Sequence, residues 1–196
     1  MRSIYLSLLL TFSSLCYGNT GAMEVLIPAE VVAAKIQEAA AAINRDYRDK
    51  ELAILMIMKG SLCVTADLIR HIDVPFSLDY LKASSYGLNG TTSGKLTITN
   101  LENLDIEGKD VLIVDDIFET GKTLAGVIKI LEERHPKSIK SLMLLVKNIP
   151  RATDYRPDYT LFEIPDRFVI GYGIDYKERF RGLPDICAFV NDTPPF

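Results

Sequence analysis

Two adjacent acidic residues stand where a buried strand is expected to end. Residues 111–114 read Val-Leu-Ile-Val, an uninterrupted apolar run typical of a strand covered on both faces. Asp115 and Asp116 follow at once, and residues 117–123 continue as Ile-Phe-Glu-Thr-Gly-Lys-Thr into a predicted helix. Because neighbouring carboxylates repel each other, the pair needs a ligand or a cation as its partner. Acids that cap the helix from a solvated loop are the alternative interpretation.

The residues after the pair indicate what that partner is. A helix start exposes backbone N–H groups that suit one phosphate, and Thr120 and Thr123 add hydroxyl donors. The stretch is not a nucleoside-triphosphate loop of the GxxxxGK[ST] type, because Asp116 stands where the first glycine belongs. A ligand with a phosphate at one end and neutral hydroxyls at the other, such as a ribose 5-phosphate, meets both demands. A divalent cation would offset the repulsion between the carboxylates.

The predicted strands and helices bring these residues to one edge of a sheet. Apolar runs and alternation predict strands at residues 52–58, 76–80, 96–98, 111–114, 141–146, 159–164 and 168–174. Helical spacing predicts helices at residues 28–47, 62–72 and 123–134. This alternation indicates an α/β fold with a mostly parallel central sheet flanked by helices, in which ligands bind beyond the carboxyl ends of the strands. Lys59, Asp115, Asp116 and Lys147 all fall at such ends.

Composition limits the class of protein. The chain has 196 residues, of which 48% are hydrophobic and 24% charged, and we expect one globular domain over residues 23–196. A net charge of −4 argues against a nucleic-acid partner. Residues 1–22 resemble a secretory leader, and a start set too far upstream of Met23 is the other explanation. Their apolar run is too short for a membrane span, so no membrane partner is expected for the domain.

Several blocks of the chain carry a family resemblance. Residues 111–123, VLIVDDIFETGKT, resemble the phosphoribosyl-pyrophosphate signature of the type I phosphoribosyltransferases. Five further blocks are similar to the hypoxanthine-guanine phosphoribosyltransferases within that family: residues 55–69 (LMIMKGSLCVTADLI), 84–87 (SSYG), 145–147 (LVK), 162–175 (FEIPDRFVIGYGID) and 178–181 (ERFR). The resemblance as a whole covers about residues 25–190, nearly everything after the leader-like segment.

The resemblance implies a fold and a reaction. The fold is the type I phosphoribosyltransferase fold, with a small hood formed by the terminal segments. The reaction is purine salvage: the 5-phosphoribosyl group passes from phosphoribosyl pyrophosphate to hypoxanthine or guanine, giving IMP or GMP and pyrophosphate, with Mg²⁺ as cofactor. A homodimer or homotetramer is expected. We expect a cytoplasmic protein, because the sugar-phosphate substrate is a cytosolic metabolite, and export through residues 1–22 is the alternative.

The resemblance also implies roles on the sugar-phosphate side. Asp115 and Asp116 match acids that hold the ribose hydroxyls, in part through Mg²⁺. Lys59 and Gly60 match a pyrophosphate-binding loop, in which the family has a non-proline cis peptide before the lysine. Arg181 matches a pyrophosphate-binding arginine. The 5′-phosphate cradle matches Glu119, Thr120, Gly121, Lys122 and Thr123.

On the base side, the resemblance gives Lys147 the 6-oxo oxygen of the purine. A lysine has donors and no acceptor, so it favours this oxygen over the 6-amino group of adenine. Phe168 would stack on the base, and Val169 would recognise it through its backbone. Asp175 would be a further Mg²⁺ ligand beside Asp115 and Asp116.

Residues 84–94, SSYGLNGTTSG, are almost all small or polar and are predicted to form a mobile loop. The resemblance makes this loop a catalytic lid, with Ser84 and Tyr86 as contacts. Closure would exclude water from the reaction. Glu119, Lys147 and Arg181 are the residues expected to act in catalysis.

Glu119 departs from the family pattern, which has an aspartate here and assigns it to the proton on the purine N7. The carboxylate is kept and its reach is longer by one methylene. Two other functions stay open: a phosphoribosyl-pyrophosphate-binding regulator without catalysis, and a relative that prefers xanthine.

Overall fold

A computed structural model describes residues 23–86 and 93–190, and its centre is a six-stranded sheet. The strands are β2 (Leu52–Met58), β3 (Phe76–Tyr86), β4 (Ser93–Thr99), β5 (Asp110–Phe118), β6 (Ser138–Lys147) and β7 (Tyr159–Ile164), in the order β4-β3-β2-β5-β6-β7. Only the β3–β4 pair of this sheet is antiparallel. The expected mostly parallel sheet is therefore confirmed.

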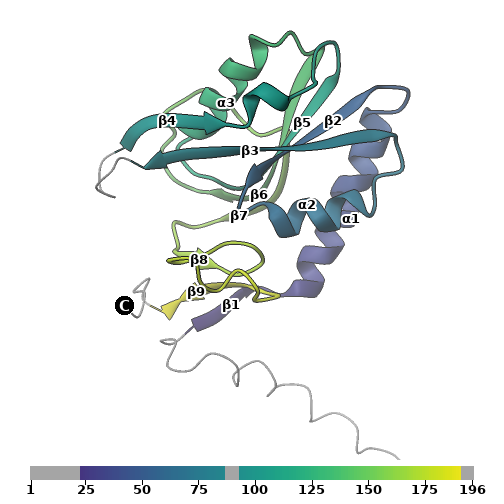
Figure 1. Ribbon diagram of the computed structural model, residues 1–196. Helices are drawn as coiled ribbons and strands as arrows, with labels where there is room; N and C mark the ends of the chain where they lie inside the picture. The colour runs from purple at the N-terminus through teal and green to yellow at the C-terminus, as the bar shows by residue number, and fades with distance from the viewer. Residues whose placement is uncertain (1–22, 87–92, 191–196) are drawn as a thin grey trace, which may run out of the picture.

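Helices cover both faces of this sheet (Figure 1). They are α1 (Ala29–Asp46), α2 (Leu62–Ile69) and α3 (Lys122–Glu132), with a 3₁₀ turn, η1 (Leu101–Asn103), before β5. Side chains of α1 and α2 pack in one apolar cluster with residues from one face of β2, β5 and β6. Side chains of α3 pack in a second cluster with residues from the opposite face of these strands. Of the helices in the described residues, none is long and apolar enough to cross a membrane.

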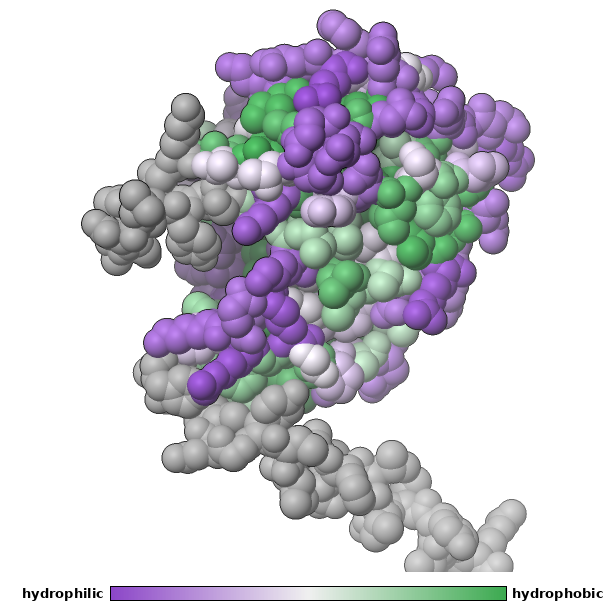
Figure 2. All heavy atoms as spheres, viewed as in Figure 1, coloured by the Kyte–Doolittle hydropathy of each residue, from purple (hydrophilic) through white to green (hydrophobic). Residues whose placement is uncertain are grey.

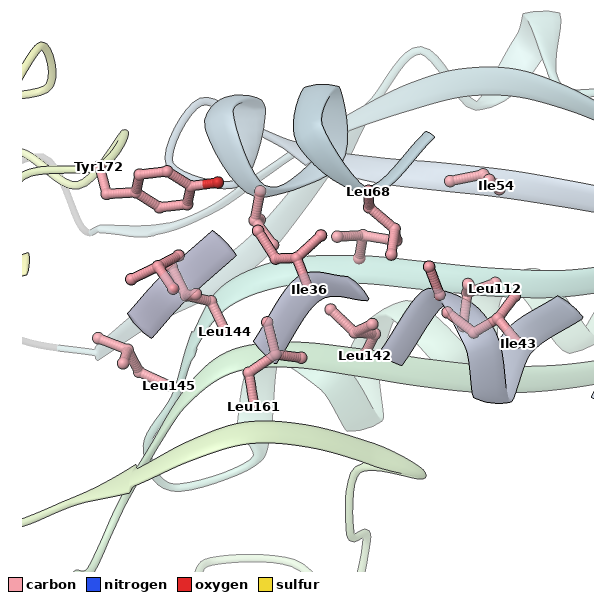
Figure 3. Close-up of a cluster of buried hydrophobic side chains, with 14 of the residues drawn as sticks. Ile36, Ile43, Ile54, Leu68, Leu112, Leu142, Leu144, Leu145, Leu161 and Tyr172 are labelled. Atoms are coloured by element: carbon pink, nitrogen blue, oxygen red, sulfur yellow. The ribbon is translucent and has the colours of Figure 1, made fainter. Parts of the chain in front are cut away.

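The larger cluster shows why the α1 sequence forms a helix there. Its buried residues are Val32, Ile36, Ala40 and Ile43, spaced three or four apart, so they share one face. Figure 3 shows Ile36 and Ile43 of this face among leucines that rise from the sheet strands. Because β2, β5 and β6 are covered on both sides, their central residues are apolar at consecutive positions rather than at alternate ones.

A separate three-stranded antiparallel sheet forms the hood. It is made of β1 (Met23–Ile27), β8 (Val169–Ile170) and β9 (Ile186–Phe189), in the order β1-β9-β8. It lies beside the main sheet, below it in the view of Figure 1. The hood therefore joins segments from both ends of the described chain, as the resemblance implied.

Some element boundaries differ from the sequence prediction. The strand predicted at residues 168–174 is only β8, because Gly171 and Gly173 take left-handed φ angles of 93° and 96° and turn the chain. The predicted loop at residues 84–94 is strand at both ends: β3 continues to Tyr86 and β4 begins at Ser93, held together by antiparallel pairing. Residues 87–92 lie outside the described part.

Candidate active site

The carboxyl ends of β2, β5 and β6 meet at one edge of the sheet, and two cavities open there. One, of about 410 Å³, is lined by the phosphate turn, which we define as residues 119–123, together with the end of β5. The other, of about 250 Å³, is lined by Lys59 and Gly60 after β2, by Asp115 and Asp116, and by Asp175 and Arg181 from the segment before β9. Asp115, Ile117 and Thr123 line both cavities, so the two are contiguous.

The acid pair lies inside β5 and not after it. Asp115 is 9% exposed, and its carboxylate accepts a hydrogen bond from the backbone N–H of Asp116 at 2.9 Å. Asp116 accepts one from the N–H of Ile117 at 2.9 Å. Burial, and then the charge of Asp116, raise the pKa of Asp115 well above its ordinary value, and burial also raises the pKa of Asp116. These acids therefore do not cap a helix from a solvated loop.

The phosphate turn connects β5 to α3. Gly121 precedes the helix with a left-handed φ of 85°, and no side chain caps the first turn. A Cβ at Gly121 would crowd the Thr153 hydroxyl and the Phe118 ring, which explains glycine at this position. The free N–H groups at the start of α3 therefore face an open cavity, as a phosphate site requires.

Lys59 and Gly60 approach the acid pair from β2. The peptide bond between Met58 and Lys59 is cis, as the resemblance implied. A Cβ on Gly60 would overlap the Asp116 carboxylate, so only glycine lets the two segments approach this closely. The Lys59 ammonium contacts both carboxylate oxygens of Glu178, at 3.0 and 3.1 Å.

Arg181 lies beside Lys59 and shares its acidic partner. Its guanidinium donates to the Gly173 carbonyl oxygen at 2.8 Å and pairs with Asp175 at 2.7 Å and with Glu178 at 3.3 Å. Its Nε is buried and has no hydrogen-bond partner among the described residues. An unpaired donor on a cation that lines the same cavity as Lys59 favours an anionic ligand at this point.

Lys147, the last residue of β6, is 9% exposed and bridges two carboxylates. Its Nζ lies 2.6 Å from Glu119 Oε1 and 3.3 Å from Asp166 Oδ1. Burial alone would lower the pKa of the ammonium, but the hydrogen bond and charge of Glu119, and then those of Asp166, outweigh it and raise that pKa. The lysine therefore stays charged at neutral pH.

Four further predicted residues are Phe168, Val169, Ser84 and Tyr86. Val169 is buried in the hood, and Phe168 is 38% exposed beside the rings of Tyr176 and Phe189. Neither residue belongs to the described lining of the two cavities. Ser84 and Tyr86 lie in β3, but their side chains are outside the described part of the structure.

The residues present fit a magnesium ion bound together with a ligand. Asp115, Asp116 and Asp175 line the same cavity and offer the oxygen atoms that Mg²⁺ prefers. Within residues 23–86 and 93–190, no three acidic, histidine or cysteine side chains converge closely enough to hold a metal alone. Mg²⁺ commonly takes one or two carboxylates and completes its shell with water and substrate oxygens, so such a cage is not required.

Two residues of the site were missed from the sequence. Glu178 holds Lys59 from 119 positions away, and Asp166 contacts Lys147 across a loop. The one local signal was the spacing of Glu178 and Arg181, three residues apart in the ERFR block. Asp166 lies in the PDRF stretch, where nothing in the local pattern separates it from a surface charge.

The fold and site define a class: an α/β protein whose candidate anion-binding site lies at the carboxyl edge of a mostly parallel sheet. Comparison with known proteins then gives the family. The phosphoribosyl transferase domain model matches residues 27–177. The chain belongs to the phosphoribosyltransferase family.

Individual relatives are similar over most of their length. The hypoxanthine phosphoribosyltransferase of Salmonella typhimurium is 42% identical over 170 residues, which cover 86% of this chain and 96% of the relative. The hypoxanthine-guanine phosphoribosyltransferase of Bacillus subtilis is 40% identical over 163 residues, 83% of this chain and 91% of the relative. A crystal structure of a hypoxanthine phosphoribosyltransferase from Staphylococcus aureus superposes with a TM-score of 0.81 at 38% identity, covering 86% of this chain and 92% of that one.

Proposed function

We propose that this protein transfers the 5-phosphoribosyl group from phosphoribosyl pyrophosphate to hypoxanthine or guanine, giving IMP or GMP and pyrophosphate. One observation carries the proposal: in a member of this family, the acid pair, the phosphate turn, the Lys59–Arg181 cations and Lys147 gather around two contiguous cavities or at their rim. Each group suits a different part of these two substrates.

The sugar phosphate would lie along the end of β5. The N–H groups of the phosphate turn hold its 5′-phosphate, and Asp115 and Asp116 accept hydrogen bonds from the ribose hydroxyls. Lys59 and Arg181 bind the pyrophosphate, which leaves with the electrons of its bond to the anomeric carbon. Mg²⁺ held by Asp115, Asp116 or Asp175 would neutralise charge on this leaving group. These residues therefore hold the sugar still while charge develops on both sides of the broken bond.

The base would bind beside Lys147 and Glu119, against both side chains. On hypoxanthine and guanine the 6-oxo oxygen and N7 are neighbours on one edge of the ring. A donor and an acceptor that lie 2.6 Å apart suit this edge: Lys147 donates to the oxygen, and Glu119 accepts the proton that leaves N7. Adenine offers an amino group in place of the oxygen, and Lys147 cannot accept from it. Phe168 and Val169 remain proposed contacts of the base, and Ser84 and Tyr86 remain proposed contacts in the lid.

A base panel tests the function. We expect the purified chain to convert hypoxanthine and guanine with phosphoribosyl pyrophosphate and Mg²⁺, and to leave adenine unchanged. Product is followed by the absorbance of the nucleotide, with chelator as the control. Tight binding of phosphoribosyl pyrophosphate without turnover of any base would instead identify a regulator, and preferential turnover of xanthine would identify the xanthine-preferring alternative.

We also propose a homo-oligomer, a dimer or a tetramer, that works in the cytoplasm. A stripe of three exposed side chains on β3, Phe76, Leu78 and Tyr80, supports an interface between copies. The face of the molecule that carries β3 and α2 is partly apolar in Figure 2. The cytoplasm is proposed because the sugar-phosphate substrate is made there.

A further inference from the structure

The segment that follows β6 packs against the phosphate turn. The backbone N–H of Ala152 donates to the Thr120 carbonyl oxygen at 2.9 Å. The Arg151 guanidinium donates to the Glu119 carbonyl oxygen and also lies over the Phe118 ring, 4.9 Å from its centroid. A guanidinium both stacks on aromatic faces and donates in its own plane, so Arg151 satisfies two contacts at once. Two consecutive carbonyl groups of the turn are therefore held by one neighbouring loop.

Holding these carbonyl groups fixes the direction of two N–H groups. In a trans peptide, the C=O of one residue and the N–H of the next point in opposite directions. A Glu119 carbonyl held by Arg151 therefore turns the Thr120 N–H away from Arg151. A Thr120 carbonyl held by Ala152 does the same for the Gly121 N–H.

Those two N–H groups are available to a ligand. Neither has an acceptor among the residues that the structure describes. Thr120 and Gly121 line the cavity of about 410 Å³, and Arg151 is not among the described residues that do. The arginine therefore lies behind the turn, and the donors that it orients lie in front.

We infer that Arg151 is a positioning residue for the phosphate turn, which directs the N–H groups of Thr120 and Gly121 toward the 5′-phosphate without contacting it. This inference rests on the proposed function, because it takes the ligand to be a sugar phosphate. The N–H donors of a phosphate site are effective only when they are already aligned, since realignment on binding would cost conformational entropy.

Two probes separate this role from a general loss of structure. The full chain is titrated calorimetrically with ribose 5-phosphate, which needs the turn, and with Mg²⁺-pyrophosphate, which needs Lys59 and Arg181. We expect Arg151→Ala to weaken ribose 5-phosphate binding about tenfold or more, the order of one charge-assisted hydrogen bond lost, and to leave pyrophosphate binding unchanged. Arg151→Lys keeps the charge without the planar fork, so it should recover only part of the affinity.

Arg156→Ala is the matched control. Arg156 is in the same loop and donates to the carbonyl oxygens of Thr153 and Tyr155, not to the phosphate turn. We expect the Arg156→Ala variant to bind ribose 5-phosphate with the same affinity as the unchanged protein. The same loss in both alanine variants would assign the effect to the loop as a whole and overturn the inference.

Four other results are decisive. Unchanged ribose 5-phosphate affinity in Arg151→Ala overturns the inference, as does an equal loss of both ligands. If Arg151→Ala does not fold, the ribose 5-phosphate affinity of Arg151→Lys tests the inference. Full affinity in that variant would mean that charge alone suffices, and would overturn the inference. If the unchanged protein binds neither probe, the proposed function fails, and the inference fails with it.

Discussion

At the scale of single residues, Glu119 is the proposed acceptor of the N7 proton, at a position where the resemblance implies an aspartate. We predict that Glu119→Gln folds normally and loses at least ~10² in the rate of the chemical step, because an amide cannot take the N7 proton. Glu119→Asp should keep most of the activity, since the carboxylate remains. Single-turnover kinetics measure this step without interference from slow nucleotide release.

Glu133→Gln, at the exposed far end of α3, is the control and should behave as wild type. A single-turnover rate of Glu119→Gln equal to wild type would show that the residue only supports Lys147 and the helix start. The proton would then pass to another acceptor.

Lys147 should act on the base alone. We predict that Lys147→Ala weakens binding of hypoxanthine by about 1.5–3 kcal/mol, the value of a hydrogen bond from a charged donor. Binding of phosphoribosyl pyrophosphate should persist, because Lys59 and Arg181 are untouched. Separate titrations with hypoxanthine and with phosphoribosyl pyrophosphate measure the two affinities. Lys129→Ala, on the exposed face of α3, is the control. A loss confined to the sugar-phosphate titration would remove Lys147 from the base pocket.

At the scale of elements, Asp46 joins three of them. It is the last residue of α1, and its carboxylate accepts from the Tyr159 hydroxyl of β7 at 2.5 Å and from the Lys140 ammonium of β6 at 3.1 Å. The Tyr159 hydrogen bond, and then that of Lys140, lower the pKa of Asp46. A carboxyl whose pKa is lower in the folded state stabilises the fold above its unfolded pKa, and this contribution is lost as the pH falls through the folded value.

We therefore predict that Asp46→Asn lowers the free energy of unfolding at pH 7 by only about 0.5–1 kcal/mol, since the pair is solvent-exposed and screened. The difference from wild type should begin to shrink below pH ~4, where the unfolded carboxyl becomes neutral, and should keep shrinking as the pH falls through the lower folded pKa. Urea denaturation at pH 7, 5 and 3 measures this, with exposed Asp154→Asn as control. A difference that stays constant across this range would mean that the ionised carboxylate is not the stabilising form.

Among the strands and helices, some could be predicted from the sequence and others could not. The buried strands and α1 were predictable from the spacing of their apolar residues. A strand covered on both faces, such as β2, is apolar at consecutive positions, whereas a helix covered on one face, such as α1, is apolar at every third or fourth position. β1 and β9 were not predicted as strands, and the extension of β3 was missed, because short or polar strands depend on their partner for pairing.

For the site, the residues that follow apolar strands were predictable, since the parallel sheet brings strand ends together. Arg151, Asp166 and Glu178 were not, because their partners lie in other segments of the chain. Sequence spacing does not encode contacts between residues on different loops.

At the scale of the whole molecule, the stripe on β3 predicts assembly. Leu78 is 46% exposed and stands between Phe76 and Tyr80 on the same face of the strand. Sedimentation should show a species larger than one chain, and Leu78→Glu should shift it toward the monomer, because a buried unpaired charge is costly. Val31→Glu, at a similarly exposed position of α1, should not change the assembly. A monomeric wild type would contradict the proposed oligomer.

We expect the carboxylate of Glu178 to give the site selectivity among dissolved anions. It is tethered three residues before Arg181 and already contacts both Lys59 and Arg181, so it acts as a competitor with an effective concentration on the order of millimolar. Chloride or a single phosphate would gain little binding free energy by displacing the Glu178 carboxylate, since each carries about the same charge as that carboxylate. A pyrophosphate group carries several charges and can meet both cations together. We therefore expect the resting ion pairs to disfavour small anions relative to pyrophosphate at this point.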